Sequence, residues 1–399
     1  MFRLFLCAVS LVIAGLGPSG GALALAATPP PDAVDATDTD TAFEVALDRY
    51  IALIEAEPID PVEAARLREE VAYLADGGHG PALNLLAIIT EQGVDRPANP
   101  QAAYALYRLA AQAGSPDAAI NLAVRDIGSD DAAAQAAGIA SLDALLVRED
   151  VSDTQRALVN GYRGWALART QQPDPADTAT AISLLEGGLL ADPGNAAFNR
   201  ALAELLEPLA ATAAERMVVL DHYQRAGEAG DGRAAWKAGM MHLDGSLGEP
   251  DPVEALRWVN VAAIAGLDDG VISLAVMHAI GQGTPVDGPR ARALYADVAM
   301  RGNAHALRAL GAMLIFGEGG PAEPARGVAL LELAADAGDQ LARRILDDIA
   351  PQLPDTTAWT GAVLDARSSF LRDANLAPSD LYGAQTSASA APAVMTRPE

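Results

Sequence analysis

The sequence predicts an all-α protein, a right-handed α-solenoid of antiparallel helix pairs, because one pattern is repeated along it at a fixed interval. Four glycines stand 36 residues apart, at Gly230, Gly266, Gly302 and Gly338. Other residues keep the same phase inside each copy, among them Met241, Met277 and Met313. Self-similarity at a period of roughly 20–50 residues is typical of solenoids. This organisation favours a binding scaffold over an enzyme.

One copy shows how the helix pair is encoded. Small and apolar residues recur at helical spacing from Asp231 until Gly245, which ends the first helix. Asp251 and Pro252 begin the second, because aspartate caps a helix N-terminus and proline fits its first position. Gly266 then provides the left-handed backbone on which the chain turns back. Small residues at shared phases predict close helix contacts: Gly239, Ala275 and Gly311 on the first helices, and Ala263, Ala299 and Ala335 on the second.

These motifs resemble those of a known repeat family. The run from Ala306 to Gly311, followed by Gly317-Glu318-Gly319 and by Ala329 to Gly338, is similar to a Sel1-like repeat of exported bacterial proteins. Pro81 to Gly114 resembles the same repeat. The family's tyrosine at the end of the first helix is replaced here by His242, His278 and Leu314. The resemblance implies a tetratricopeptide-like fold.

The N-terminal residues predict export. Residues 1–26 have the pattern of a signal peptide, in which Arg3 precedes an apolar segment and cleavage follows Ala26. The only cysteine, Cys7, lies inside the apolar segment, so we do not expect a lipoprotein. We therefore expect a periplasmic or secreted protein with no transmembrane segment in the mature chain.

The remaining segments follow from composition and periodicity. We expect an acidic disordered linker at 27–40, an N-terminal helical pair at 41–78, a repeat array at 79–350, a capping helix at 355–376 and a disordered tail at 377–399. Clear repeats cover 79–114, 231–266, 267–302 and 303–338, and 115–230 is a degenerate continuation. First helices are expected to begin near residues 82, 117, 157, 195, 232, 268, 304 and 340.

Charge and motif content exclude several functions. The chain has 53 acidic and 27 basic residues, a formal net charge of −26, which repels nucleic acids and anionic lipids. A basic partner and simple solubility are both compatible with this charge. The sequence lacks the nucleophile elbow, the His-Glu-x-x-His pair, the phosphate-binding loop and the dinucleotide fingerprint. We expect no enzymatic activity, no cofactor and no bound metal.

Four residues are candidates for partner binding. Trp236 and Arg308 share one phase on the first helices, which line the concave groove in tetratricopeptide-like arrays, so they either contact a partner or pack between repeats. His242 and His278 occupy equivalent positions of adjacent repeats. They could replace the family tyrosine in packing or contact a ligand. A shared zinc would need further ligands that the local sequence does not offer.

The leading functional hypothesis is a periplasmic protein–protein interaction scaffold or adaptor that holds a protein or peptide of the cell envelope. The resemblance implies two finer roles, regulation of a sensor kinase and assembly of an envelope or exopolysaccharide system. The alternative is an accessory protein or enzyme acting on peptidoglycan or polysaccharide, and a small-molecule binder is a third class. The sequence leaves the oligomeric state open.

Overall fold

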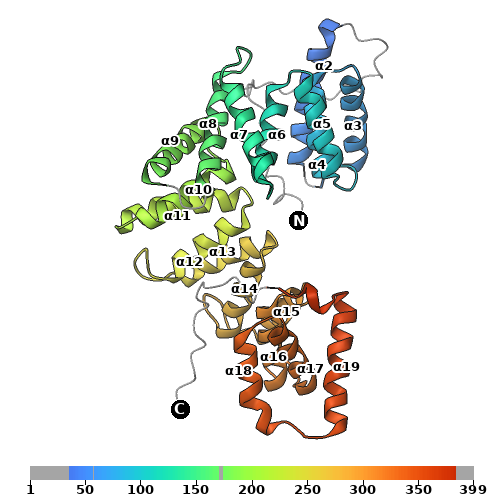
Figure 1. Ribbon diagram of the computed structural model, residues 1–399, viewed down its shortest axis with the longest axis vertical. Coiled ribbons are helices and arrows are strands. Elements are labelled where there is room, and N and C mark those ends of the chain that lie inside the picture. Colours follow the sequence, from blue (N-terminus) through green and yellow to red (C-terminus); the bar gives the residue numbers. More distant parts are fainter. Residues whose placement is uncertain (1–35, 57, 170–173, 383–399) are drawn as a thin grey trace. The chain divides into compact units, whose positions relative to one another are not determined.

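The computed structural model describes residues 36–56, 58–169 and 174–382, and this part of the chain is helical throughout (Figure 1). Among these residues the only β-type pairing is an isolated bridge between Asn303 and Tyr382. The expected signal peptide at 1–26 lies outside the described residues. None of the described helices has the length and apolarity that crossing a bilayer requires. The chain divides into two compact units, residues 1–211 and 212–399, which are described separately.

The first unit is a series of helix pairs. Its helices are α2 (Ala36–Glu55), α3 (Pro61–Asp76), α4 (Gly80–Gln92), α5 (Pro100–Gln112), α6 (Pro116–Gly128), α7 (Ala132–Leu146), α8 (Asp153–Ala168), α9 (Pro175–Ala191) and α10 (Ala196–Leu206). The partners α4 and α5, α6 and α7, and α8 and α9 pack against each other, and each pair also contacts the next helix. The degenerate stretch therefore forms helix pairs like those of its neighbours.

The second unit is also a series of helix pairs. Its helices are α11 (Ala213–Glu228), α12 (Gly232–Leu243), α13 (Pro252–Ile264), α14 (Asp268–Ile280), α15 (Gly288–Ala299), α16 (Ala304–Phe316), α17 (Pro324–Asp336), α18 (Gln340–Ile349) and α19 (Thr357–Ala374). Helix α17 packs against both α18 and α19 (Figure 1). Consecutive pairs stack on one another, so the fold is an all-α solenoid, as the repeat period predicts.

Seven of the eight expected first-helix starts lie within two residues of the observed ones, and the eighth, expected near 157, is at Asp153. First helices begin at Gly80, Pro116, Asp153, Ala196, Gly232, Asp268, Ala304 and Gln340. The Asp251 side chain accepts hydrogen bonds from the backbone N–H groups of Val253 and Glu254, which is the expected N-cap. Gly266 has φ +84°, the left-handed conformation that the turn requires.

Glycines at helix contacts bring the backbones close together. A Cβ atom on Gly311 of α16 would lie 2.9 Å from the carbonyl oxygen of Gly327 on α17. A Cβ on Gly239 of α12 would lie 2.8 Å from Val259 of α13. Both distances are too short for any larger side chain. Around these contacts the core is nearly solvent-free, since Leu330, Leu331 and Leu333 are completely buried, each contributing ~1.5–3 kcal/mol.

Two expected disordered segments contain ordered residues. Helix α2 begins at Ala36, inside the expected linker, and the Asp40 carboxylate lies 2.9 Å from Nε2 of His79. At the other end, the expected tail folds back onto the loop before α16. Tyr382 donates its N–H to Gly302 over 2.9 Å and accepts from the N–H of Ala304 over 2.7 Å. Composition does not predict these contacts, because each joins residues that are distant in the sequence.

Candidate functional site

Trp236 and Arg308, expected at a partner surface, both connect adjacent repeats. Trp236 is half-buried, and its indole N–H donates to Oγ of Ser273 on the next first helix over 2.9 Å. Arg308 donates to the carboxylate of Asp339 over 2.9 Å. That carboxylate also caps α18, by accepting the N–H groups of Leu341 and Ala342. Both side chains therefore have a structural task, and partner contact by them stays a prediction.

The two histidines have different surroundings. His242 is half-buried, and its Nε2 lies 3.3 Å from the amide nitrogen of Gln224 on α11. His278 is buried, with 8% of its surface exposed, and its Nδ1 has no hydrogen-bond partner among the described residues. In the part of the chain that the structure covers, no three or more His, Cys, Asp and Glu residues are placed to hold a metal ion.

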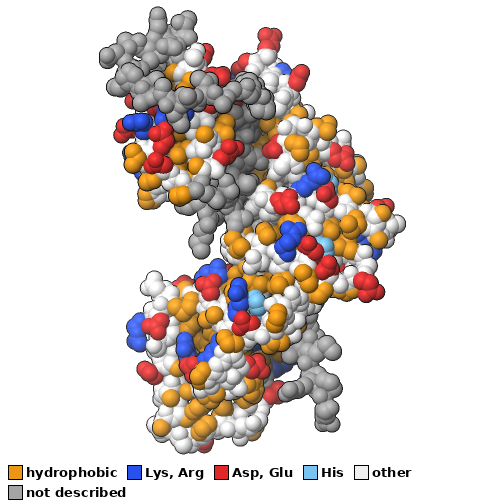
Figure 2. All heavy atoms as spheres, turned by 180° about the vertical axis from the view of Figure 1, so that it is seen from behind, with side chains coloured by type: hydrophobic (Ala, Val, Ile, Leu, Met, Phe, Trp, Pro, Cys, Tyr) orange, Lys and Arg blue, Asp and Glu red, His pale blue; other side chains and the backbone are white. Residues whose placement is uncertain are grey.

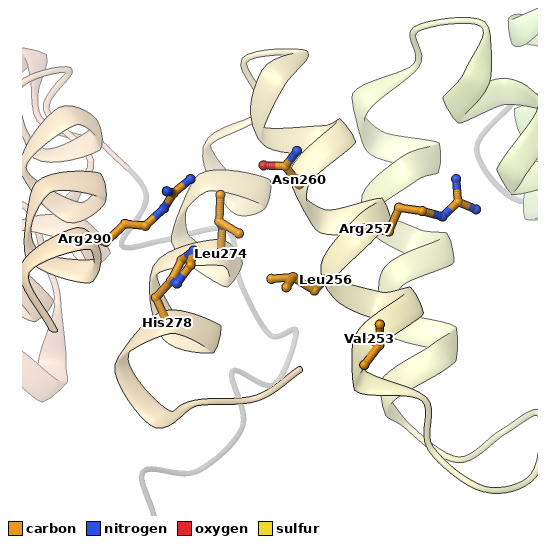
Figure 3. Close-up of a pocket in the computed structure, with 7 residues that line it drawn as sticks. All are labelled: Val253, Leu256, Arg257, Asn260, Leu274, His278 and Arg290. Atoms are coloured by element: carbon orange, nitrogen blue, oxygen red, sulfur yellow. The ribbon is translucent and has the colours of Figure 1, made fainter. Parts of the chain in front are cut away.

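His278 lies in a cleft of about 340 Å³ between consecutive repeats (Figure 3). Three helices form it, and its lining residues are Val253, Leu256, Arg257 and Asn260 of α13, Leu274 and His278 of α14, and Arg290 of α15. Leu256 points toward Leu274 and His278, whereas Arg257 extends from the opposite side of α13 (Figure 3). The cleft thus has an apolar floor with Asn260, His278 and Arg290 around it.

The surroundings of His278 favour the neutral form of its imidazole. Burial lowers the pKa of His278, and the nearby guanidinium of Arg290 lowers it further, against the opposing charge of Asp287. Because Nδ1 is buried without a partner, the proton is better placed on Nε2, since buried N–H groups without acceptors are rarer than buried acceptors without donors. In this tautomer Nε2 is a hydrogen-bond donor.

Arg290 is the cation of the cleft that carries no internal partner. Its guanidinium makes no hydrogen bond or ion pair with any described residue, and the side chain is exposed. The nearest acidic residue along its own helix, Asp287, instead uses its carboxylate to cap α15, accepting the N–H of Arg290 over 3.0 Å. Arg257, in contrast, pairs with Glu254 over 2.7 Å and stacks on the ring of Trp258.

A model of the Sel1 repeat matches four segments of the chain, residues 80–115, 232–267, 270–303 and 304–339. The chain therefore contains Sel1 repeats in these four segments. Its structure is similar to that of a protective antigen of uropathogenic Escherichia coli with an SLR fold, with a TM-score of 0.57 and 19% identity over 84% of this chain and 69% of that one. A Sel1 repeat protein from Oxalobacter formigenes has a TM-score of 0.47 and 22% identity over 78% of this chain and 87% of that one. A search of curated proteins finds no significant match.

The Sel1 register explains why sequence reasoning found His278 and missed the rest of its cleft. Arg290 corresponds to Glu254 one repeat earlier and to Arg326 one repeat later, and Asn260 corresponds to Gln224. These positions lie on second helices and are half-buried or exposed, and variation at such positions attracts no attention. The usable signal was that histidine, asparagine and arginine coincide in one repeat alone. Nothing in the sequence indicates that they lack internal partners.

Proposed function

We propose that this Sel1-like repeat protein is an exported scaffold that docks a protein or peptide of the cell envelope on its second unit. Sel1 repeat proteins are generally interaction scaffolds, and the solenoid is a scaffold-type fold. The observation that carries the proposal is the cleft around His278. Asn260, His278 and Arg290 have no side-chain hydrogen-bond partner among the described residues and lie beside an apolar floor, which is the composition expected of a binding site.

Export rests on the sequence of the first 26 residues. Arg3, the apolar run that follows it and the small residues before Ala26 support secretion into the periplasm. Within the envelope, regulation of a sensor kinase and assembly of an exopolysaccharide system are the two settings that the family resemblance favours. Fractionation of cells that express the full chain tests export. A protein that keeps residues 1–26 and stays in the cytoplasm would contradict this part of the proposal.

Site-specific photo-crosslinking in cells tests the docking surface. A crosslinking amino acid at Val253, which is 66% exposed at the edge of the cleft, should give one reproducible protein adduct that mass spectrometry can identify. Leu364 on α19 is also exposed and belongs to the same unit, so it serves as the matched control position. The adduct should be absent there.

The outcomes separate the two functional classes. A protein adduct at Val253 that is absent at Leu364 supports the scaffold. Recovery of peptidoglycan or polysaccharide fragments at Val253, with no protein, would instead support the alternative role in cell-wall metabolism. Equal labelling at both positions would show that the cleft is not a specific docking surface.

A further inference from the structure

We infer that the His278 cleft binds the carboxylate of one acidic side chain in an extended segment of the partner protein. This inference rests on the proposed scaffold function and names the chemistry that the scaffold recognises. In the complex, the aliphatic part of the acidic side chain packs on Leu256 and Leu274. Its carboxylate receives hydrogen bonds from Arg290, Asn260 and His278.

The polar groups around the cleft are suited to an acceptor. Arginine has five N–H donors and no acceptor, in a planar fork that matches the two oxygens of a carboxylate. Arg290 offers this fork without an internal ion pair in the described structure. His278 adds its Nε2–H donor, and the amide of Asn260 adds two further N–H groups. Such a set favours an anionic ligand over a cationic one.

The neighbouring repeats show that these groups are unusual in having no partner in the described part of the chain. One repeat earlier, Gln224 contacts His242, and Glu254 stands at the arginine position, where it pairs with Arg257. One repeat later, leucine replaces the histidine, and Arg326 pairs with Glu323 over 3.2 Å. The same backbone positions thus satisfy their polar side chains internally on both sides. The repeat that contains His278 leaves its own unsatisfied.

Side-chain length explains why this repeat differs. Asn260 is one methylene shorter than Gln224, so it makes no hydrogen bond with the histidine below it, and space is left between them. Asp287 is one methylene shorter than Glu323 and is occupied in capping its helix, whereas Glu323 makes no cap bond and reaches its arginine. Two short side chains therefore open the cleft and leave Arg290 available.

The size and surroundings of the cleft fit a side chain within a peptide. A volume of about 340 Å³ lies near the lower end of the ~300–1,000 Å³ range of ligand pockets, so the cleft has room for one side chain of a peptide. Val253 is exposed at its edge, so the cleft is open to a passing segment. The exposed carboxylate of Asp287 lies nearby, which favours basic residues beside the bound carboxylate.

The net charge of the protein narrows the range of charge that a partner segment can carry. Acidic side chains are scattered over the face seen in Figure 2 and are not gathered into one patch. A strongly acidic partner would be repelled by the formal net charge of −26, but this field is screened beyond ~8 Å at physiological salt. One carboxylate in an otherwise neutral or basic segment reaches Arg290 without that repulsion.

Oriented peptide libraries test the inference directly. Acetylated and amidated nonapeptides with a central Glu, Gln or Lys and random flanking residues are captured on the immobilised full chain. A fourth library carries a central Gln and a free C-terminal carboxylate. We expect capture of the Glu library to exceed that of the Gln and Lys libraries about tenfold, equivalent to ~1.4 kcal/mol.

Three variants locate the effect. Arg290→Ala should abolish the preference for Glu, whereas Arg326→Ala, the matched control one repeat later, should retain it. Asn260→Gln should also abolish the preference, because a glutamine fills the cleft and bonds His278 as Gln224 does with His242. Thermal unfolding of each variant near the wild-type temperature establishes that the solenoid is intact.

Every other result overturns the inference. Equal capture of the Glu and Gln libraries, unchanged capture by Arg290→Ala, capture of the free C-terminus alone, or no capture by the wild type would each do so. Failure here is distinct from failure of the scaffold. If a protein is crosslinked at Val253 but the Glu and Gln libraries are captured equally, the docking surface is supported and only the inference of carboxylate recognition is wrong.

Discussion

Two histidines at the same position of adjacent Sel1 repeats have opposite situations. His242 is half-buried and contacts Gln224. We call its repeat closed, because its histidine has a hydrogen-bond partner within the array. His278 is buried beside a cleft, with one ring nitrogen unsatisfied and with an arginine nearby that has no partner among the described residues. We call this repeat open. The repeat register places both rings identically. The residues one helix before and one helix after decide what each ring does.

This difference shows where function enters a repeat protein. The framework of caps, turns and small contact residues is shared by both repeats and determines the fold. We propose that recognition depends on residues that are free to vary without disturbing that framework, such as Asn260 and Arg290. A changed side-chain length at one of them is enough to convert a closed repeat into an open one.

The largest expected effect comes from breaking the shared framework. Gly311→Leu introduces a side chain where even a Cβ atom would lie 2.9 Å from a carbonyl oxygen of α17. Overpacking of this kind costs ~1–3 kcal/mol, so the free energy of unfolding of the variant should fall by that amount in urea titrations. An unchanged value would mean that the helix pairs are not in close contact. The two histidines could then no longer be compared as equivalent positions of one framework.

The sequence predicted the framework well because it is local. The cap at Asp251, the turn at Gly266 and the small residue at Gly311 each specify backbone geometry within one helix pair, and the 36-residue register repeats them. The ends were less predictable. The return of Tyr382 to the loop at Gly302 depends on a contact 80 residues away in sequence (382 minus 302), which no local pattern encodes.

The candidate site was predicted only in part. The histidine phase indicated His278, because His242 and His278 occupy equivalent positions of adjacent repeats. Trp236 and Arg308 were chosen by phase too, yet their side chains connect adjacent repeats. A phase gives the direction of a side chain. It does not show whether a neighbouring residue already satisfies that side chain, which depends on lengths and rotamers across three helices.

Replacing each histidine with leucine should move stability in opposite directions. His278→Leu removes a buried nitrogen without a partner, and Leu314 shows that a leucine fits this phase one repeat later. We expect a gain of ~1 kcal/mol. His242→Leu loses the contact with Gln224 and should cost ~0.5 kcal/mol. Paired urea titrations measure both, and changes of the same sign would erase the difference between the two sites.

Lengthening Asn260 should turn the open repeat into a closed one. Asn260→Gln places an amide where it can bond His278, as Gln224 does with His242. A typical hydrogen bond contributes ~0.5–1.5 kcal/mol, and with the entropy cost of the longer side chain we expect a gain near the lower limit. A crystal structure of the variant shows whether the new bond forms. If the amide points into solvent and the cleft stays open, side-chain length is not what separates the two repeats.

The smallest effect is a pH dependence that belongs to the open repeat. The lowered pKa of His278 means that the unfolded chain, with an ordinary histidine pKa near ~6.5, takes up a proton first as the pH falls. Stability is unaffected by this group above that pH and declines below it, until the folded-state pKa is passed. His278→Leu should remove this decline below about pH 6.5, which urea titrations at a series of pH values measure.

Titration of the His278 ring by NMR identifies the cause of this decline. Burial is the main reason for the lowered pKa, and Arg290 is a second one that Asp287 partly opposes. Arg290→Ala should therefore raise the pKa of His278 without restoring it fully to the ordinary value, because the ring stays buried. A carboxylate bound in the cleft acts in the same direction by favouring the protonated ring. An ordinary pKa of His278 in the wild-type protein would mean that this ring is as well hydrated as a surface histidine. It would then not be the neutral hydrogen-bond donor that we infer for the cleft.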